Sequence, residues 1–457
     1  MAAVASFRQN RADFCNESTK ESPSSCQTAR STARICRNLP PNVSWTTSFD
    51  RLPDEVGATM QAQTEGRREA NLGLLLRTLR ARGPLSRAQL AAGSGLSKAT
   101  LSPLLANLER RGLTERAGTT TTQGRPGQLV QLRPGAVCGI GLDIRPGHVG
   151  ATITDLTGDV RLRRQTRCDT SAPEHALDRL ADLARTALKD LPKADWAAVT
   201  VAVPGRADRT AGTATATRLR WREVAVVDGL AARTGLPLDR LDVDNEANLA
   251  AYAVHDGDPV DDLVYLNGDH SVAAGVIANG ALVRGADNRA GEVGHMVLDP
   301  LGSTYCACGR RGCWETQVGL DAFLHACAPR HDRVHDPELA PTERMSILRG
   351  RAERGDARTL DALHRTAAAL ASGLSILVTV LDPRKIVLGG YFAALQDWLV
   401  APQEQGRTRV TASTLGFTAG GKGAALAALR RVLDDPTVVP VKDSGPKTGG
   451  SHEGASA

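Results

Sequence analysis

The sequence predicts an α/β protein preceded by a small helical domain. From Pro134 onward, short apolar runs typical of buried strands alternate with segments of helical period. Before Pro134, apolar residues recur at the spacing of three short helices. A third observation is a dense cluster of three cysteines and one histidine between residues 295 and 313, which is typical of a metal-binding loop.

The composition is that of a soluble globular protein. The hydrophobic fraction is 41%, and the first thirty residues contain no apolar stretch of a signal peptide. No run of 18 or more apolar residues occurs, so we expect no membrane span. We expect the protein to be cytoplasmic. The six cysteines outside the cluster have no repeating spacing and imply no disulfide framework.

We expect four segments along the chain. Residues 1–65 are rich in Ser, Thr, Arg, Asn and Pro without a sustained period, which predicts a disordered extension. Residues 66–134 form the helical domain, and residues 135–441 form the α/β domain. Residues 442–457 contain Gly-Pro and Gly-Gly pairs and are a predicted disordered tail.

The helical domain has the signals of a helix-turn-helix. A first helix from Arg67 to about Arg82 carries a stripe of leucines. Ser86 and Gln89 form a capping-box signature for a short second helix, which Gly93 and Gly95 end. A third helix begins at Ser97 and buries a second leucine stripe. We expect four residues of this helix to contact DNA: Ser97, Lys98, Thr100 and Ser102. Asn107 is also expected on or beside the polar side of the helix.

A wing is predicted after the third helix. A Thr-rich stretch and the run from Gly124 to Val130 read as strand, turn and strand, and Arg125 at the turn is a candidate for the minor groove. Eleven Lys and Arg residues lie between residues 67 and 125, as phosphate neutralisation needs. The alternative is a helical bundle for packing or dimerisation. Pro103 fits poorly inside a recognition helix, unless the first turn is distorted or the helix restarts at Ser102.

The α/β region begins with a strand pair. Residues 138–144 and 149–155 read as a buried hairpin, residues 181–188 as a helix, and residues 197–203 and 241–244 as further strands. The aliphatic segment 370–378 is predicted to be helical, either in the core or at a subunit interface, and core is the preferred interpretation.

The cysteine cluster predicts a structural zinc site. The candidate ligands are His295, Cys306, Cys308 and Cys313, with glycines at 309 and 312 where the loop must turn tightly. Four ligands of this type leave no position for a catalytic water, so Zn²⁺ would be structural. The alternative is that these are small buried residues of a reduced core.

Several motifs follow one another as in the ROK family of repressors and sugar kinases. They are Pro204-Gly205, Asn245-Glu246-Ala247-Asn248, Gly291-Glu292-Val293-Gly294-His295, the cysteine loop and Leu388-Gly389-Gly390. The chain resembles this family over most of residues 67 to 435. The resemblance implies an N-terminal winged helix-turn-helix followed by a two-lobed, actin-like (ribonuclease-H-like) domain with a cleft between the lobes.

The phosphate-binding signals of the kinases are altered. In the kinases that the chain resembles, the first hairpin carries a small-residue loop that cradles ATP, whereas here residues 143–148 include Arg145 and Pro146. The second phosphate loop falls on residues 269–271, where Asp269 adds negative charge. The catalytic aspartate of the kinases corresponds to Glu246. We therefore expect no ATP-dependent phosphoryl transfer and no enzymatic activity.

The resemblance implies that the sugar-facing groups are retained. They are Asn245, Glu246, Glu292, His295 and Glu315. His295 would bind zinc through one nitrogen and face the sugar with the other. For Glu292 and Glu315 a supporting or solvated role is the alternative.

The sequence thus predicts a transcriptional regulator of carbohydrate metabolism, and we expect a repressor. Its expected partners are double-stranded operator DNA and a sugar or sugar derivative, and the expected assembly is a homodimer or homotetramer. The alternatives are a sugar kinase with an attached DNA-binding domain and a regulator whose activity does not depend on a small ligand.

Overall fold

The computed structural model describes residues 54–119, 128–191, 195–400 and 408–442, and side chains from residue 66 on. The predicted extension before residue 54, the tail beyond Lys442 and Arg125 lie outside the described residues. Residues Thr64–Ala457 form one compact unit, apart from Met1–Gln63. The first helix begins at Asp54 rather than near Arg67. Residues 54–66 have no leucine stripe, but several of them are good helix formers, which favours a helix there.

The N-terminal elements have the order and pairing of a winged helix-turn-helix. They are α3 (Asp54–Arg82), β1 (Leu85–Ser86), α4 (Arg87–Ser94), α5 (Lys98–Arg110), β2 (Thr114–Thr119) and β3 (Gln128–Leu132). The three strands form an antiparallel sheet in the order β1-β3-β2. The leucine stripes of α3 and α5 are buried in one cluster, as predicted.

Local signals in the sequence set the turn between α4 and α5. Ser86 and Gln89 make the predicted reciprocal capping box, and Gly95 ends α4 with a left-handed φ of 70°. Ser97 then caps α5 by accepting a hydrogen bond from the Thr100 amide. Helix α5 runs without interruption through Pro103, so neither a restart at Ser102 nor a break occurs.

The first lobe is a five-stranded sheet in the order β11-β7-β4-β5-β6. Its strands are β4 (Val137–Arg145), β5 (His148–Asp155), β6 (Val160–Arg167), β7 (Asp195–Val203) and β11 (Leu241–Asn245). Strands β4, β5 and β6 are antiparallel neighbours, and β7 and β11 run parallel to β4. Helices α6 (Pro173–Lys189) and α7 (Val226–Thr234) belong to its core, and a small sheet is formed by β8 (Arg206–Asp208), β9 (Thr213–Ala216) and β10 (Trp221–Ala225).

The second lobe repeats this topology. Its sheet has the order β14-β13-β12-β15-β16. The strands are β12 (Leu263–Gly268), β13 (Val272–Ala278), β14 (Ala281–Val283), β15 (Lys385–Gly389) and β16 (Arg409–Ala412). Again an antiparallel meander is followed by two parallel strands. Two sheets with the same strand order agree with the predicted two-lobed, actin-like fold.

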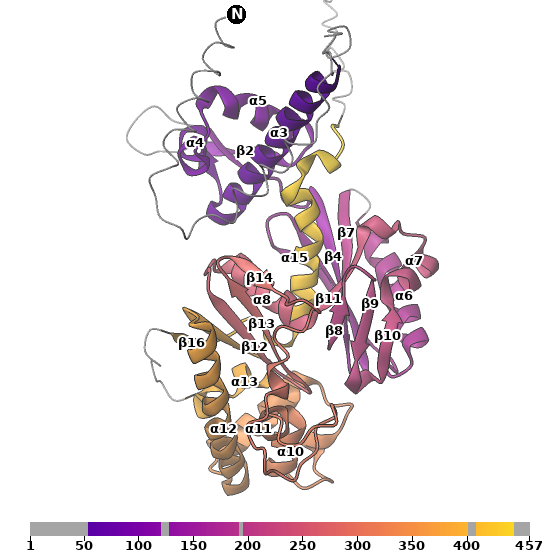
Figure 1. The fold of residues 1–457 in the computed structure, drawn as a ribbon, viewed down its shortest axis with the longest axis vertical. Helices are drawn as coiled ribbons and strands as arrows, with labels where there is room; N and C mark the ends of the chain where they lie inside the picture. The colour runs from indigo at the N-terminus through magenta and orange to yellow at the C-terminus, as the bar shows by residue number, and fades with distance from the viewer. Residues whose placement is uncertain (1–53, 120–127, 192–194, 401–407, 443–457) are drawn as a thin grey trace, which may run out of the picture. The chain divides into compact units, whose positions relative to one another are not determined.

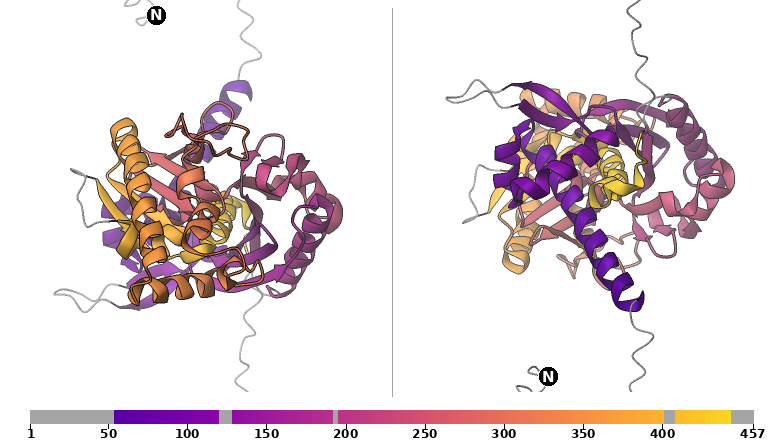
Figure 2. Two further views of the ribbon diagram at one scale, coloured as in Figure 1. Left: turned by 90° about the horizontal axis from the view of Figure 1, so that it is seen from below. Right: turned by 90° about the horizontal axis from the view of Figure 1, so that it is seen from above.

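Six helices accompany the second sheet, and six short 3₁₀ turns occur among the described residues. The helices are α9 (Glu315–Val318), α10 (Leu320–Cys327), α11 (Pro341–Glu353), α12 (Ala357–Leu381), α13 (Gly390–Ala394) and α14 (Gln396–Leu399). The turns are η1 (Thr217–Leu219), η2 (Leu238–Arg240), η3 (Val293–His295), η4 (Arg333–His335), η5 (Gly416–Thr418) and η6 (Pro436–Val438). The helices α10, α11 and α12 lie together beside the second sheet (Figure 2).

Helix α12 contains the aliphatic segment 370–378. Leu370, Leu374 and Leu377 are buried in the core of the second lobe, which bears out the core interpretation for that face. Ile376 and Val380 lie on the other side of the helix and are exposed. Among the described residues, α12 alone has the length and composition of a membrane span, but its leucines pack against the sheet as those of a core helix do.

Two helices lie between the sheets and connect them. Helix α8 (Glu246–Gly257) packs on β13, and α15 (Ala419–Asp434) packs on β4 and crosses α8 (Figure 1). The crossing is close because Gly423 on α15 faces the backbone of α8, where a Cβ atom would overlap the Leu249 carbonyl. Helices α8 and α15 thus connect the two lobes, and we call them the hinge helices.

The winged helix-turn-helix packs onto the same two helices. The leucines of α3 share one buried cluster with Leu426, Leu429 and Leu433 of α15. Arg80 on α3 forms an ion pair with Asp256 at the end of α8, with 2.9 Å between Nη2 and Oδ2, and both side chains are largely buried. The N-terminal elements are therefore in direct contact with the hinge helices.

Candidate functional site

Three cysteines and one histidine converge between β14 and α9. The ligand atoms of His295, Cys306, Cys308 and Cys313 all lie within 4.8 Å of one another. Cys308 Sγ is 3.6 Å from Cys313 Sγ, and Cys306 Sγ is 3.5 Å from His295 Nδ1. A tetrahedron with metal–sulfur bonds of about 2.3 Å has edges of roughly 3.8 Å, so the spacing fits an ion of the size of Zn²⁺. The cluster can hold a metal ion.

The backbone of the cysteine loop turns back on itself at two glycines. Gly309 and Gly312 have left-handed φ values of 88° and 68°. The turn is closed by hydrogen bonds from the Cys306 amide to the Arg310 carbonyl and from the Gly309 amide to the Cys306 carbonyl. At Gly312 a Cβ atom would overlap the Asp299 carbonyl, so a side chain there would push the loop open.

His295 faces both the cysteines and a neighbouring cavity. Its Nδ1 atom points toward Cys306, and its Nε2 atom is 3.7 Å from Glu292 Oε2. Both residues line a cavity of about 560 Å³. One ring nitrogen of His295 therefore faces the cysteines, and the other faces Glu292 at the cavity.

The cavity lies between the two lobes and collects every predicted sugar-facing residue. The first lobe contributes Gly205, Arg206 and Asn245, and the second contributes Ser271 and residues around the metal cluster. Asn245, Glu246, Glu292, His295 and Glu315 all line it. Four arginines also line it, at positions 206, 218, 289 and 310.

Two of these residues already have protein partners. Asn245 caps α8, because its Oδ1 accepts from the amides of Ala247 and Asn248 while its Nδ2 donates to the Gly205 carbonyl. Glu315 is buried, and its two oxygens accept from Arg218 and from the Val272 amide, both at 3.0 Å. The supporting role that the sequence left open for Glu315 is therefore present, and it shapes the cavity floor.

Glu246 begins α8 and separates the cavity from a second crevice. Its Oε1 accepts a hydrogen bond from Asn267 Nδ2 at 3.2 Å. Burial, with the nearby charge of Asp269, raises the pKa of the Glu246 carboxyl to about 8. A carboxyl in this state is protonated at neutral pH and can donate as well as accept a hydrogen bond.

The crevice on the far side of Glu246 contains little open space, since its volume is about 20 Å³. Arg145 extends into it, pairing with Asp143 at 3.2 Å and donating to the Phe417 carbonyl at 3.3 Å. Asp269 lies on its other wall, in the turn between β12 and β13 where the second phosphate loop was predicted. Side chains thus fill the space between the two altered loops.

Four of the predicted DNA-contacting residues lie at the N-cap and in the first turns of α5. Lys98, Thr100 and Ser102 are exposed, and so is Ser97, although its hydroxyl also caps the helix. Asn107, which was expected on or beside the polar side, is buried instead, and its Oδ1 accepts from Arg111 Nε at 2.8 Å. The error arose because position 107 lies at the edge of the leucine stripe, where periodicity assigns burial poorly.

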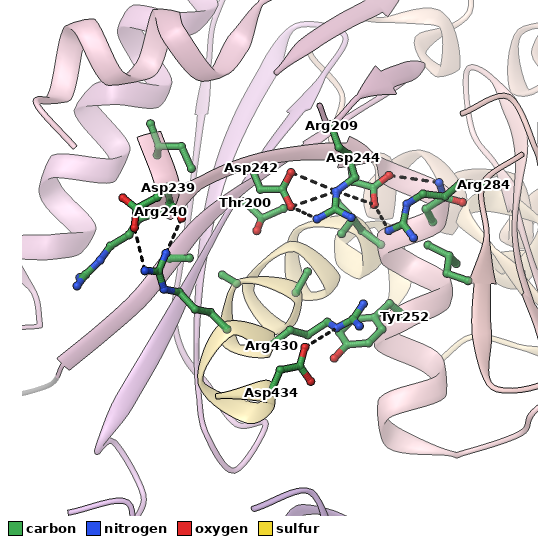
Figure 3. A pocket seen from close by; sticks show the side chains of 18 of the residues that line it. Thr200, Arg209, Asp239, Arg240, Asp242, Asp244, Tyr252, Arg284, Arg430 and Asp434 are labelled. Atoms are coloured by element: carbon green, nitrogen blue, oxygen red, sulfur yellow. Dashed lines mark hydrogen bonds and ion pairs between the residues drawn. The ribbon is translucent and has the colours of Figure 1, made fainter. Parts of the chain in front are cut away.

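Sequence reasoning missed the ion pairs that join the lobes. Arg284, after β14, donates to Asp244 on β11 with 2.6 Å between Nη2 and Oδ2 (Figure 3). Asp244 is almost fully buried, and its other oxygen accepts from the Asn245 amide and Asn248 Nδ2. The only signal in the sequence was a charged residue at the end of a buried strand, which needs a partner.

A further cavity of about 570 Å³ surrounds this ion pair. Each carboxylate that lines it has an arginine partner: Asp239 pairs with Arg431, Asp242 with Arg209, Asp244 with Arg284, and Asp434 with Arg77 and Arg430. Figure 3 shows the pairs that Asp242, Asp244 and Asp434 form with Arg209, Arg284 and Arg430. Paired charged side chains thus line this cavity beside α8 and α15. The cavity shares no lining residue with the cluster of three cysteines and one histidine.

Comparisons with known proteins agree with this architecture. The ROK family model matches residues 139–429, which is more than half of the chain. A second model, described as DNA glycosylase AlkZ-like, matches residues 16–139. The xylose repressor of Bacillus subtilis (strain 168) is 26% identical over 332 residues, covering 70% of this chain and 82% of the repressor.

Two solved structures have a similar fold. A ROK family transcriptional regulator, described as a homologue of the Escherichia coli Mlc protein, has a TM-score of 0.65 at 21% identity, covering 81% of this chain and 97% of that one. A ROK family glucokinase from Streptomyces griseus, in complex with glucose and AMPPNP, has a TM-score of 0.54 at 24% identity. The match covers 99% of the glucokinase but 64% of this chain, so part of this chain has no counterpart in the kinase.

Proposed function

This chain belongs to the ROK family, and on that premise we propose that it is a DNA-binding transcriptional repressor whose ROK domain binds a sugar effector. The observation that carries the proposal is the presence, in one compact unit, of an exposed polar face on α5 and of a polar cavity of about 560 Å³ beside a Cys₃His cluster. The xylose repressor matched along most of its length supports it.

The effector site in this proposal is the cavity between the lobes. Carboxyl, amide and imidazole groups supply the donors and acceptors that sugar hydroxyls require. Zn²⁺ held by the Cys₃His cluster would stiffen the loop that carries His295 and would supply no catalytic chemistry. The chain's own residues bind and orient the sugar, and the metal keeps one wall in place.

Coupling between effector and DNA follows from the packing of the hinge. A sugar that binds one lobe arrangement better than the other shifts the population toward it. Because α3 packs on α15 and its Arg80 pairs with Asp256 of α8, a change at the hinge is transmitted to α3 and to the recognition helix α5. Allosteric coupling is typically about 1–3 kcal/mol. In a homodimer or homotetramer this changes the spacing of two recognition helices.

A sugar kinase with an attached DNA-binding domain is the second candidate, and the glucokinase fold match is the observation that favours it. Against it stand Arg145 and Asp269 in the crevice of about 20 Å³, where a nucleotide would need space and small residues. A third candidate is a regulator without a small ligand. In our proposal the protein acts in the cytoplasm, where its DNA and sugar ligands are.

The first test is selection of bound fragments from genomic DNA by the zinc-loaded full chain, followed by titration of the recovered sequence. We expect a specific site, and Lys98→Ala should weaken its binding about tenfold or less and reduce the salt slope by about 1, because one phosphate contact is lost. Lys189→Ala, an exposed lysine on α6, is the matched control and should leave both unchanged. Recovery of no specific sequence would contradict the proposal.

A further inference from the structure

The effector cavity is lined by more arginines than carboxylates. Arg206, Arg218, Arg289 and Arg310 line it, against Glu246, Glu292 and Glu315. Neutral sugars are recognised by hydroxyl-directed hydrogen bonds and do not require surplus guanidinium groups. The surplus points to a ligand that carries negative charge.

Two of the four arginines are already engaged. Arg218 bridges Glu315 and Asp321, at 3.0 Å and 2.7 Å, and belongs to the cavity floor. Arg310 lies in the cysteine loop, where its guanidinium contacts the Cys308 sulfur. Neither is available to an additional anion without losing its present partner.

The other two have no such partner. Among the described residues, the side chains of Arg206 and Arg289 form neither a hydrogen bond nor an ion pair, although both line the cavity. Both lie close enough to Glu292 to lower its pKa, against the larger effect of burial, which raises it. Arg206 is half-buried and Arg289 is exposed, whereas Asn245 and Glu315 are buried. The two unpartnered guanidinium groups thus lie nearer the solvent than the buried Asn245 and Glu315, which already have protein partners.

These two arginines come from different lobes. Arg206 begins β8 in the first lobe, and Arg289 lies between β14 and Glu292 in the second lobe. A planar guanidinium pairs with carboxylate or phosphate oxygens through two parallel hydrogen bonds. An anionic group held by both would therefore join the lobes across the cavity mouth.

We propose that the effector is an anionic carbohydrate, whose carboxylate or phosphate group is bound by Arg206 and Arg289 while its hydroxyls meet the cavity floor. This proposal rests on the proposed function, because it names the class of sugar that the same site takes. A ligand of this class would bind more tightly to the lobe arrangement in which both arginines reach its anionic group, because its charge is neutralised only there.

The test is calorimetric titration of the zinc-loaded full chain with matched sugars. The probes are glucose, glucuronate and glucose 6-phosphate, and the same three forms in the galactose series. We expect an anionic form to bind at least about tenfold more tightly than its neutral parent, with a preference that weakens at high salt. Tighter binding of the uronate identifies a carboxylate, and tighter binding of the 6-phosphate identifies a phosphate.

Variants separate a direct contact from a general effect of charge. Arg206→Gln and Arg289→Gln should each remove most of the preference for the anionic form and leave binding of the neutral parent within about twofold. Arg222→Gln, on exposed β10 outside the cavity lining, is the control and should retain the preference. Equal or tighter binding of the neutral sugar by the unaltered protein would overturn this inference while supporting the proposed function. If no form in either series binds, both fail.

Discussion

The two spaces on either side of Glu246 differ in what remains open. On one side, next to the cysteine cluster, a cavity of about 560 Å³ brings together side chains from both lobes. On the other side, a crevice of about 20 Å³ is filled by Arg145 and walled by Asp269. Both spaces share the same hinge helix, so the fold itself does not explain the difference. Side chains in two loops leave little space on one side of Glu246, while the other side stays open. In our proposal this contrast is what allows sugar binding without phosphoryl transfer.

The largest expected effect concerns the open space and its metal cluster. Cys308→Ala should abolish stable zinc binding and weaken sugar binding by about 100-fold or more, because the loop that carries His295 loses its anchor. Metal content by mass spectrometry and sugar titration measure the two effects. Cys168→Ser, which lies outside the cluster, is the control and should keep both. Full sugar binding by a zinc-free Cys308→Ala protein would show that the two sites are independent.

A second prediction concerns the helix that both spaces share. Gly423→Ala places a methyl group against the Leu249 carbonyl, so α15 and α8 must separate. We expect a loss of about 1–3 kcal/mol in the free energy of unfolding, measured by urea denaturation. Gly257→Ala, where a Cβ atom meets no neighbour within 4 Å, should cost nothing. Equal stability of both variants would mean that the close crossing is not a constraint.

A third prediction uses the protonation of Glu246. Its pKa of about 8 lies above the ordinary value of 4.5, so the folded protein keeps a proton that the unfolded chain releases. Stability should therefore fall as the pH rises from about 4.5 to 8. Glu246→Gln removes this loss and should gain roughly 3 kcal/mol more at pH 8 than at pH 5, because each pKa unit corresponds to about 1.4 kcal/mol.

The exposed Glu353→Gln is the control for this pH effect. It should show no such difference between urea unfolding at pH 5 and at pH 8. If Glu246→Gln behaves in the same way as the control, Glu246 is ionised at neutral pH and the closed crevice is more polar than its burial indicates.

The smallest expected effect is that of ATP. Because Arg145 and the Phe417 carbonyl fill the crevice, MgATP should give no heat of binding up to about 1 mM, with or without sugar. No transfer of phosphate to glucose or galactose should be detectable. Micromolar binding of ATP, or any turnover, would favour the kinase candidate and remove the contrast between the two spaces.

Periodicity and capping signals were sufficient for the N-terminal helices and for the first strand pair of the α/β domain. The leucine stripes, the Ser86–Gln89 box and the apolar runs at 138–144 and 149–155 each became the predicted element. The start of α3 was wrong because residues 54–66 have helix propensity without an apolar stripe. An apolar stripe predicts which face of a helix is buried, and a segment without such a stripe gives no signal of this kind.

The site was predictable only where ligand chemistry leaves a spacing in the sequence. The cysteine loop has such a spacing, and its four ligand atoms do converge. The Asp244–Arg284 pair and the arginines of the cavity have none, because their partners are far apart in sequence and meet through the sheet order. The closed crevice could be anticipated from Arg145 and Asp269, but its filling by the Phe417 backbone depends on how α15 enters the fold.

The central claim is that sugar bound between the lobes changes the affinity of the winged helix-turn-helix for DNA. The most direct measurement is the dissociation constant of the zinc-loaded protein for its selected DNA site, with and without a saturating amount of the sugar that binds most tightly. We predict a change of about 5- to 150-fold, which corresponds to a coupling of about 1–3 kcal/mol. A dissociation constant that stays the same while the sugar is bound would contradict the account.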